Sequence, residues 1–262
     1  MKVLVLGGTS DGRRLTTKLV AKALPIEIIY SVAGLVGKAQ LDCEVISGGF
    51  SKTGGLKAFL ERESIAVVLD LTHPYAISIS RQSQSACAQL GLAYWQFVRP
   101  QWQAQTGDSW HCFSDWDVLL DYLKHYKRAL VTTGQLQQSQ LDAIASDCEQ
   151  VCYRTAAPSS VVLAKNVQWI KAKGPFAQED ELALLKQLQS DVLICKNAGG
   201  TATSAKLEAA RILGVDVLML ERPVSERMID SAPLQDLDSL LAFVVDYVTE
   251  QTALSSAKND NK

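Results

Sequence analysis

The stretch KVLVLGGTSDGR, residues 2–13, decides the fold class of this chain. It begins with a nearly apolar run of strand length, which meets two glycines at Gly7 and Gly8 and then a helix-forming segment. A short apolar strand that ends in a glycine turn before a helix is typical of the first βα unit of a doubly wound parallel sheet. Residues 2–6 are therefore expected to form a strand of an α/β domain.

The same alternation of short apolar runs and amphipathic runs continues along the chain. Strands are predicted at residues 26–30, 44–46, 66–70 and 93–98, and again at 129–131, 151–154, 168–170, 191–195 and 215–220. Amphipathic segments with helical spacing lie between them. This alternation predicts two Rossmann-like domains with parallel sheets, over residues 1–99 and 100–250, with the active site in the cleft between them and a polar tail at 251–262. The two halves show no close internal sequence repeat.

Composition excludes several classes of protein. The 262 residues carry a net charge of −2, whereas a nucleic-acid-binding protein usually has a basic excess. No apolar run approaches the ~20 residues of a membrane span, and residues 2–6 are too few for a signal-peptide core, so we expect a cytoplasmic protein. The six cysteines are scattered without a CxxC pair, and no histidine stands near Cys148 and Cys152. We therefore expect reduced thiols and no metal site.

The first glycine turn is predicted to bind a dinucleotide phosphate. Gly7 and Gly12 hold the first and third positions of a GxGxxG fingerprint, and Thr9 holds the second, where its hydroxyl adds a donor. Backbone N–H groups at the start of the following helix would face the anion, and Arg13 could be aimed back at it. The cofactor-binding residues expected here are Gly7, Gly8, Thr9, Ser10, Asp11 and Arg13.

Two further strand ends belong to the same predicted cofactor site. The end of the second strand, SVAG at 31–34, offers Ser31 and Gly34 but no acidic residue for a ribose 2′-hydroxyl, which favours NADPH with NADH as the alternative. The segment DLTHPYA, residues 70–76, follows the fourth strand and contributes Thr72, His73 and Pro74. His73 is also a candidate catalytic residue, because ligands of such folds bind outside the carboxyl ends of the strands.

Polar and basic strand ends recur in the second half of the chain. The segments TTGQ (132–135), KGPF (173–176) and KNAGG (196–200) each follow a predicted strand, and Arg222 ends the last one. Glycine turns beside lysines are typical of anion sites, so a multiply negative ligand is expected. The predicted substrate-binding residues are Thr133, Lys173, Gly174, Lys196, Gly199, Gly200, Lys206 and Arg222.

Nine short motifs in order make the chain resemble the precorrin-6A reductase family of cobalamin biosynthesis, including the cobalt-precorrin-6A reductases. They are LGGTSDGR (6–13), SVAG (31–34), GGF (48–50), DLTHPYA (70–76), TTG (132–134), GPF (174–176), KNAGG (196–200), KL (206–207) and ERP (221–223). Asp11 replaces the usual glutamate of the family, Leu35 replaces a frequent arginine, and the GGF turn runs on through Lys52. Loss of that arginine bears on the choice between NADPH and NADH.

The resemblance implies an oxidoreductase that transfers a hydride from NAD(P)H to a ring double bond of precorrin-6A, or its cobalt form, to give the dihydro 6B product. It implies a nicotinamide-dinucleotide-binding N-terminal domain and a substrate-binding C-terminal domain, with the carboxylate-rich tetrapyrrole between them. It implies neither a metal nor a covalent nucleophile. His73, Lys196 and solvent are the candidate proton donors. The partner is a small tetrapyrrole, with no nucleic acid and no membrane, and the protein is a monomer or a small homo-oligomer.

Two other hypotheses remain at this point. Another NAD(P)-dependent reductase or epimerase on the same fold would usually carry a Tyr-x-x-x-Lys pair. Tyr122 is followed four residues later by Tyr126, and Tyr153 by Ala157, so that signature is missing. A non-enzymatic NAD(P)-sensing module would need the first glycine turn but not the basic loops of the second half.

Overall fold

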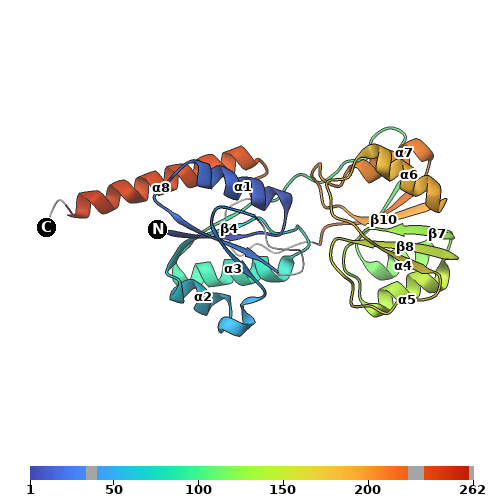
Figure 1. The fold of residues 1–262 in the computed structure, drawn as a ribbon, viewed down its shortest axis with the longest axis horizontal. Coiled ribbons are helices and arrows are strands. Elements are labelled where there is room, and N and C mark those ends of the chain that lie inside the picture. Colours follow the sequence, from blue (N-terminus) through green and yellow to red (C-terminus); the bar gives the residue numbers. More distant parts are fainter. Residues whose placement is uncertain (34–39, 224–232, 260–262) are drawn as a thin grey trace. The chain divides into compact units, whose positions relative to one another are not determined.

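The computed structural model describes residues 1–33, 40–223 and 233–259, which form two compact units. The N-terminal unit contains Met1–Arg99 together with residues 233–259, and the central unit contains residues 100–223. Each unit is a parallel sheet covered by helices on both faces (Figure 1). The predicted fold class, two α/β parts with parallel sheets, is confirmed.

The N-terminal unit has a five-stranded sheet in the order β3-β2-β1-β4-β5, and every strand pair is parallel. The strand order reverses between β1 and β4. This position is the topological switch point, where doubly wound folds bind ligands. The elements are β1 (Lys2–Leu6), α1 (Ser10–Ala21), β2 (Glu27–Val32), β3 (Glu44–Ser47), the 3-10 helix η1 (Phe50–Thr53), α2 (Leu56–Arg62), β4 (Ile65–Asp70), α3 (Ile77–Leu90), β5 (Ala93–Gln96) and α8 (Leu237–Asn259).

The first strand shows why its sequence is apolar throughout. Side chains alternate between the two faces of a sheet, so Val3 and Val5 point to one face while Leu4 and Leu6 point to the other. Helices α1 and α8 cover the first face, and α2 and α3 cover the second (Figure 1). Because both faces are covered, a polar residue would be buried at any of these four positions.

Helix α8 corrects the predicted domain boundary. Residues up to 250 were assigned to the second domain and 251–262 to a tail, but α8 runs from Leu237 to Asn259 and packs on the N-terminal unit. Leu240, Val244 and Val248 lie in the same buried cluster as Val3 and Leu15. Each such side chain contributes about 1.5–3 kcal/mol relative to an exposed one. The helix therefore belongs to the unit whose core it completes.

The central unit has a six-stranded parallel sheet in the order β6-β11-β10-β7-β8-β9. Helices α6 and α7 cover one face and α4 and α5 the other (Figure 1). The sequence analysis missed β6 and α4, whose residues are only partly apolar. The elements are β6 (Trp110–Phe113), α4 (Trp116–Leu123), β7 (Arg128–Val131), α5 (Gln138–Asp147), β8 (Gln150–Thr155), β9 (Val167–Lys171), α6 (Gln178–Leu188), β10 (Val192–Lys196), α7 (Ala205–Leu213) and β11 (Asp216–Leu220).

Parallel pairing determines where the predicted site residues lie. In each unit all strands run the same way, so the loops that follow them meet at one edge of that sheet. The turns after β1, β2, β3 and β4 share the carboxyl edge of the N-terminal unit, and those after β7, β9, β10 and β11 share that of the central unit. In the described part of the chain, no helix is long and apolar enough to span a membrane.

Candidate active site

The glycine turn after β1 is held by Tyr30, a completely buried residue of β2. The Tyr30 hydroxyl oxygen accepts a hydrogen bond from the Gly8 amide at 3.1 Å, and the Gly7 amide donates to the Ser31 carbonyl at 2.8 Å. A β-carbon on Gly7 would lie 2.2 Å from the Tyr30 ring, so only glycine fits there. Burial raises the pKa of Tyr30, with the Gly8 amide and the Arg13 charge opposing it, so the phenol is neutral.

Thr9 makes two hydrogen bonds within the protein through its hydroxyl. Its hydroxyl donates to the Leu71 carbonyl at 2.7 Å and accepts from the Gly12 amide at 3.0 Å, which makes Thr9 the N-cap of α1. The side chain is buried and ties the turn after β1 to the loop after β4. Its hydroxyl therefore fixes the turn, and contact with an anion is left to the backbone N–H groups at the start of α1.

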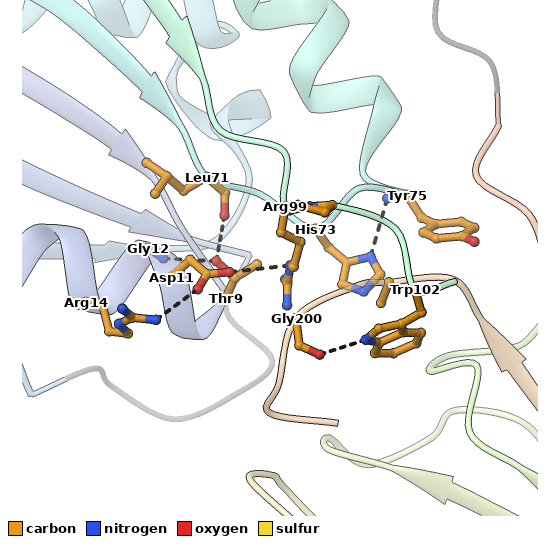
Figure 2. A network of polar contacts seen from close by, with 12 residues as sticks. Thr9, Asp11, Gly12, Arg14, Leu71, His73, Tyr75, Arg99, Trp102 and Gly200 are labelled. Carbon is orange, nitrogen blue, oxygen red and sulfur yellow. Dashed lines mark hydrogen bonds and ion pairs between the residues drawn. The ribbon is translucent and has the colours of Figure 1, made fainter. Parts of the chain in front are cut away.

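Asp11 is paired with arginines, as Figure 2 shows. Its carboxylate lies 3.4 Å from Arg99 and 3.8 Å from Arg14. These contacts show that Asp11 holds two guanidinium groups at the first turn of α1; its contact with a cofactor stays a prediction. With half-buried Arg13, three arginines and one carboxylate stand at the first turn of α1 and leave a positive excess there. The sequence analysis does not select Arg99, which is the last residue of its first predicted domain.

A cavity of about 610 Å³ opens at the carboxyl edge of the N-terminal sheet. It brings together five of the predicted cofactor residues, namely Gly7, Gly8, Ser31, Thr72 and His73. The GGF motif at 48–50 also lines it, as do Ala76, Ile79 and Gln82, which the sequence analysis did not select. Among the described residues, the lining does not include Thr9, Ser10, Asp11, Arg13 or Pro74. Gly34, like Leu35, lies outside the described residues.

The loop after β4 is shaped by Asp70, which is completely buried. One carboxylate oxygen accepts from the Thr72 amide at 3.0 Å and from the Thr72 hydroxyl at 2.7 Å. The other oxygen accepts from the Tyr94 hydroxyl at 2.8 Å and from the Gln96 amide at 3.3 Å. Four donors on one carboxylate compensate for the cost of burying its charge. Asp70 therefore holds Thr72 in place, and with it the position from which the side chain of His73, the residue after Thr72, projects.

His73 has a defined tautomer in this structure. Its Nδ1 accepts a hydrogen bond from the Tyr75 amide at 3.3 Å, which Figure 2 shows. Because Nδ1 is the acceptor, the neutral ring carries its proton on Nε2. The side chain is exposed and lines the cavity. It can donate from Nε2 to a bound molecule.

The central unit gathers most of the predicted substrate residues at its carboxyl edge. Thr133 follows β7 and is 4% exposed, and no described residue is a hydrogen-bond partner of its hydroxyl. Lys173 is exposed, and Gly174 approaches the Ala202 carbonyl so closely that a β-carbon would lie 2.9 Å away. Lys196 ends β10 half-buried, and burial lowers its pKa.

The turn after β10 is built on Asn197. Its side chain accepts from the Trp102 amide at 2.9 Å and donates to the Trp102 carbonyl at 3.1 Å, while the indole N–H of Trp102 donates to the Gly200 carbonyl at 2.8 Å (Figure 2). Gly199 and Gly200 have φ of 69° and 78°, which favours glycine. Arg222 donates to the carbonyls of Asn197 at 2.8 Å and Ala198 at 3.0 Å. Arg222 therefore supports the turn after β10, and its contact with a substrate stays a prediction.

Lys206, another predicted substrate residue, is buried. It is 5% exposed near the start of α7, with its ammonium 5.6 Å from the centre of the Trp102 ring. Burial lowers its pKa, and the nearby charge of Glu181 opposes this. Glu181 itself is bound by Arg154 through contacts of 2.6 and 3.1 Å, and the Arg154 guanidinium lies 4.2 Å from the centre of the Phe176 ring. This buried group of charges supports the 173–176 loop from below.

The cysteines and other metal-binding residue types form no site in the part of the chain that the structure describes. No group of three His, Cys, Asp or Glu side chains there could hold a metal ion. All six thiols are free, and Cys112 is exposed. Burial raises the pKa of both Cys87 and Cys148 to about 12 and that of Cys152 to about 11. These buried thiols behave as small apolar side chains of the core.

Comparison with known proteins gives a consistent picture over nearly the whole chain. A family model described as precorrin-6x reductase CbiJ/CobK matches residues 2–245. A precorrin-6A reductase of Mycobacterium tuberculosis is 36% identical over 85% of this chain and 89% of its own length, and one of Rhodobacter capsulatus is 31% identical over 96% and 97%. A solved structure of CobK precorrin-6A reductase superimposes with a TM-score of 0.82 at 30% identity, covering 94% of this chain and 96% of that one.

Proposed function

Because the chain belongs to the precorrin-6x reductase CbiJ/CobK family, we propose that it transfers a hydride from NADPH to a ring double bond of precorrin-6A, or of its cobalt form, to give the dihydro 6B product. The observation that carries this proposal is the cavity of about 610 Å³ on the glycine turn of the N-terminal unit. The cavity lies at the topological switch point of the sheet, the usual ligand position in doubly wound folds.

The residues of this cavity fit a dinucleotide. Gly7 packs directly against the Tyr30 ring, which keeps the turn tight, whereas no atom of the described residues lies within 4 Å of the place where a β-carbon on Gly8 would stand. The backbone at Gly8 is therefore open to the approach of a pyrophosphate. Arg13, Arg14 and Arg99 supply positive charge at the start of α1, where the helix dipole also favours an anion. The wider cavity is mostly apolar and is suited to the flat faces of the bases. The nicotinamide ring supplies the hydride when it is bound.

We propose NADPH as the preferred hydride donor because of the residues that line the cavity at the end of β2. Enzymes that select NADH place a carboxylate there to accept from the ribose 2′-hydroxyl. No Asp or Glu is among the described residues that line this cavity, whereas the Ser31 hydroxyl is available as a donor for a 2′-phosphate. NADH remains the alternative that a direct comparison of the two affinities tests.

His73 and Lys196 are the residues proposed to act in the reaction itself. His73 lines the nucleotide cavity and accepts from the Tyr75 amide at Nδ1, which places the proton of a neutral ring on Nε2, so it is proposed to orient a group of the nucleotide or deliver a proton. Lys196 is half-buried, and its lowered pKa makes its ammonium a stronger acid than that of an exposed lysine. Reduction of the ring double bond consumes one hydride and one proton, and these two side chains are the proposed sources of the proton.

The carboxyl edge of the central unit is proposed to bind the tetrapyrrole. Lys173 and Lys196 would pair with its carboxylate side chains, and the Thr133 hydroxyl, which has no partner among the residues that the structure describes, would donate to one of them. Gly174, Gly199 and Gly200 bring the backbone close to the ligand. Lys206 and Arg222 would act indirectly, by supporting the loops on either side of the turn after β10.

The test is an anaerobic assay of the purified protein with precorrin-6A or its cobalt form. Nicotinamide oxidation is followed by absorbance and the dihydro product by mass spectrometry. We expect oxidation only when the tetrapyrrole is present, and a faster rate with NADPH than with NADH. A proton-donor role predicts that His73→Gln or Lys196→Met lowers kcat while the Kd for NADPH is unchanged. Absence of turnover by a wild-type protein that binds NADPH would refute the proposed reaction.

A further inference from the structure

The two units share one topology although their sequences show no close repeat. The N-terminal sheet reads β3-β2-β1-β4-β5, and the central sheet, read from its other end, is β9-β8-β7-β10-β11 with β6 added beyond β11. Each of the first five strands therefore has a counterpart: β1 corresponds to β7, β2 to β8, and so on to β5 and β11. The helix α1 between β1 and β2 corresponds in the same way to α5 between β7 and β8.

A buried tyrosine occupies the same place in both units. Tyr30 on β2 pairs with Val5 of β1, and Tyr153 on β8 pairs with Val131 of β7. Both tyrosines are 0% exposed. Three residues after Val5 stands Gly8 with φ of 101°, and three residues after Val131 stands Gly134 with φ of 81°. The positive φ in each case marks a turn that favours glycine.

Each tyrosine hydroxyl is bound into its turn. The Tyr30 oxygen accepts from the Gly8 amide at 3.1 Å. The Tyr153 hydroxyl donates to the Gly134 carbonyl at 3.0 Å and accepts from the Leu136 amide at 3.0 Å. A phenol has few rotatable bonds, so once its ring is packed in the core its oxygen is a rigid anchor for the loop above it. The same anchoring device therefore occurs twice.

Other ligand-facing segments correspond in the same way. The turn after β3 contains Gly48 and Phe50, and the turn after β9 contains Gly174 and Phe176. The loop after β4 carries His73, and the loop after β10 carries Gly199. In the N-terminal unit the turns after β1, β3 and β4 line one cavity. Their counterparts in the central unit are the segments predicted to bind substrate.

We infer that Tyr30 and Tyr153 are equivalent positioning residues, each holding the glycine turn of its own unit in the shape that binds a ligand. Tyr30 positions the turn for the nicotinamide nucleotide, and Tyr153 positions the 132–136 turn for carboxylates of the tetrapyrrole. The ligand assignments rest on the proposed function. Thr133, next to Gly134, supports the second assignment, because its buried hydroxyl has no hydrogen-bond partner among the described residues and could pair with a ligand group at this turn.

Removal of either hydroxyl predicts a loss of affinity on one side only. In Tyr30→Phe the Gly8 amide loses its acceptor, so the turn samples other conformations and the binding-competent fraction falls. The apparent Kd rises as that fraction falls. A rise of about tenfold in the Kd for NADPH is expected from the loss of one buried hydrogen bond. Tyr153→Phe should raise the KM for the tetrapyrrole by a similar factor.

The experiment compares Tyr30→Phe, Tyr153→Phe and the control Tyr126→Phe. Tyr126→Phe also removes a partly buried hydrogen bond, the one that the Tyr126 hydroxyl donates to Asp216 at 2.7 Å. This bond lies at the amino-terminal edge of the central sheet, opposite the edge that carries the 132–136 turn. NADPH binding is measured by nicotinamide fluorescence without substrate, and tetrapyrrole KM by turnover at saturating NADPH. We expect the first variant to weaken only NADPH, the second to weaken only the tetrapyrrole, and the control to change neither, with kcat within about twofold of the wild type throughout.

The inference is overturned if both variants raise both constants equally, or if neither constant moves while the wild type is active. A purely structural role would lower the unfolding midpoint without this separation. If the wild type binds NADPH but neither binds nor reduces precorrin-6A, the proposed function fails and the Tyr153 assignment fails with it. The Tyr30 assignment is still decided in that case by the NADPH titration alone.

Discussion

Arg154 and Glu181 form a buried ion pair. Substitution of one partner should lower the free energy of unfolding by a different amount than substitution of the other. The pair joins β8 to α6 through contacts of 2.6 and 3.1 Å, with side chains 6% and 1% exposed. Lys206 lies close enough for the charges of both partners to affect its pKa. With one anion between two cations, the group has a net charge of +1. We consider the variants Glu181→Leu, Arg154→Met and the double variant.

The local charge determines the expected order of stability. Glu181→Leu leaves Arg154 and Lys206 buried together without an anion, and we expect a loss of about 5 kcal/mol, at the upper end of the range for breaking a buried pair. Arg154→Met leaves Glu181 beside Lys206, which still neutralises it, so the loss should be about 3 kcal/mol. This includes the contact with the Phe176 ring. The double variant restores the net charge of +1 with apolar side chains of similar volume, so its stability should be within ~1 kcal/mol of the wild type or higher.

Urea unfolding followed by tryptophan fluorescence measures these changes. Four of the five tryptophans lie in the central unit, so the signal reports mainly on the unit that contains the pair. A double-mutant cycle then gives the coupling energy between the two side chains. The reasoning is refuted if each single variant costs less than ~1 kcal/mol, or if the double variant is as unstable as Glu181→Leu. The first result would show a pair that water screens, and the second would show that packing, and not charge, sets the cost.

Three further predictions follow from single residues. Gly7→Ala should lower the free energy of unfolding by about 1–3 kcal/mol and abolish NADPH binding in a fluorescence titration, because the new β-carbon would lie 2.2 Å from Tyr30. Gly49→Ala is the stability control, because the nearest atom to its new β-carbon, the Ser51 hydroxyl oxygen, would be 3.9 Å away. Lys206→Met should stabilise the protein most near neutral pH, and the gain should shrink as the pH rises towards 10.5. Burial lowers the pKa of Lys206, so the folded wild type loses this proton before the unfolded chain does, and its free energy of unfolding rises over that range. Urea titrations in which the gain grows with pH would contradict this. Cys112, the one exposed thiol among the described residues, should react first with a thiol reagent, and Cys112→Ser should remove that fast phase, which mass spectrometry of the labelled peptide can check.

Much of the fold could be predicted from local sequence. The apolar run before Gly7 and its repetition along the chain are sufficient for parallel strands, because a strand covered on both faces needs apolar residues at every position. The helix α8 was placed in the wrong unit for the opposite reason. Its spacing at Leu240, Val244 and Val248 predicts an apolar stripe, but a stripe carries no information about which sheet it covers.

The candidate site shows the same division. Glycine turns and strand-end residues such as His73 are found by their order along the chain, since parallel strands bring their carboxyl ends to one edge. The hydrogen bonds of Thr9 and Arg222 to backbone carbonyls could not be predicted, because a hydroxyl or a guanidinium in a loop has the same sequence signal whether it faces a ligand or a distant carbonyl. Arg99 gave no signal of its own.

Local patterns in the chain are sufficient to predict the α/β class, the parallel pairing, the family and the segments expected at the site, because each depends on periodicity and motif order over short stretches. What holds those segments in place follows only from the folded protein. Tyr30 and Tyr153 are ordinary aromatic residues within strands when the chain is considered alone. They become anchors because neighbouring strands bring each hydroxyl to within about 3 Å of a glycine turn more than fifteen residues away. A hydrogen bond depends on distance and direction in space, which local sequence patterns do not contain.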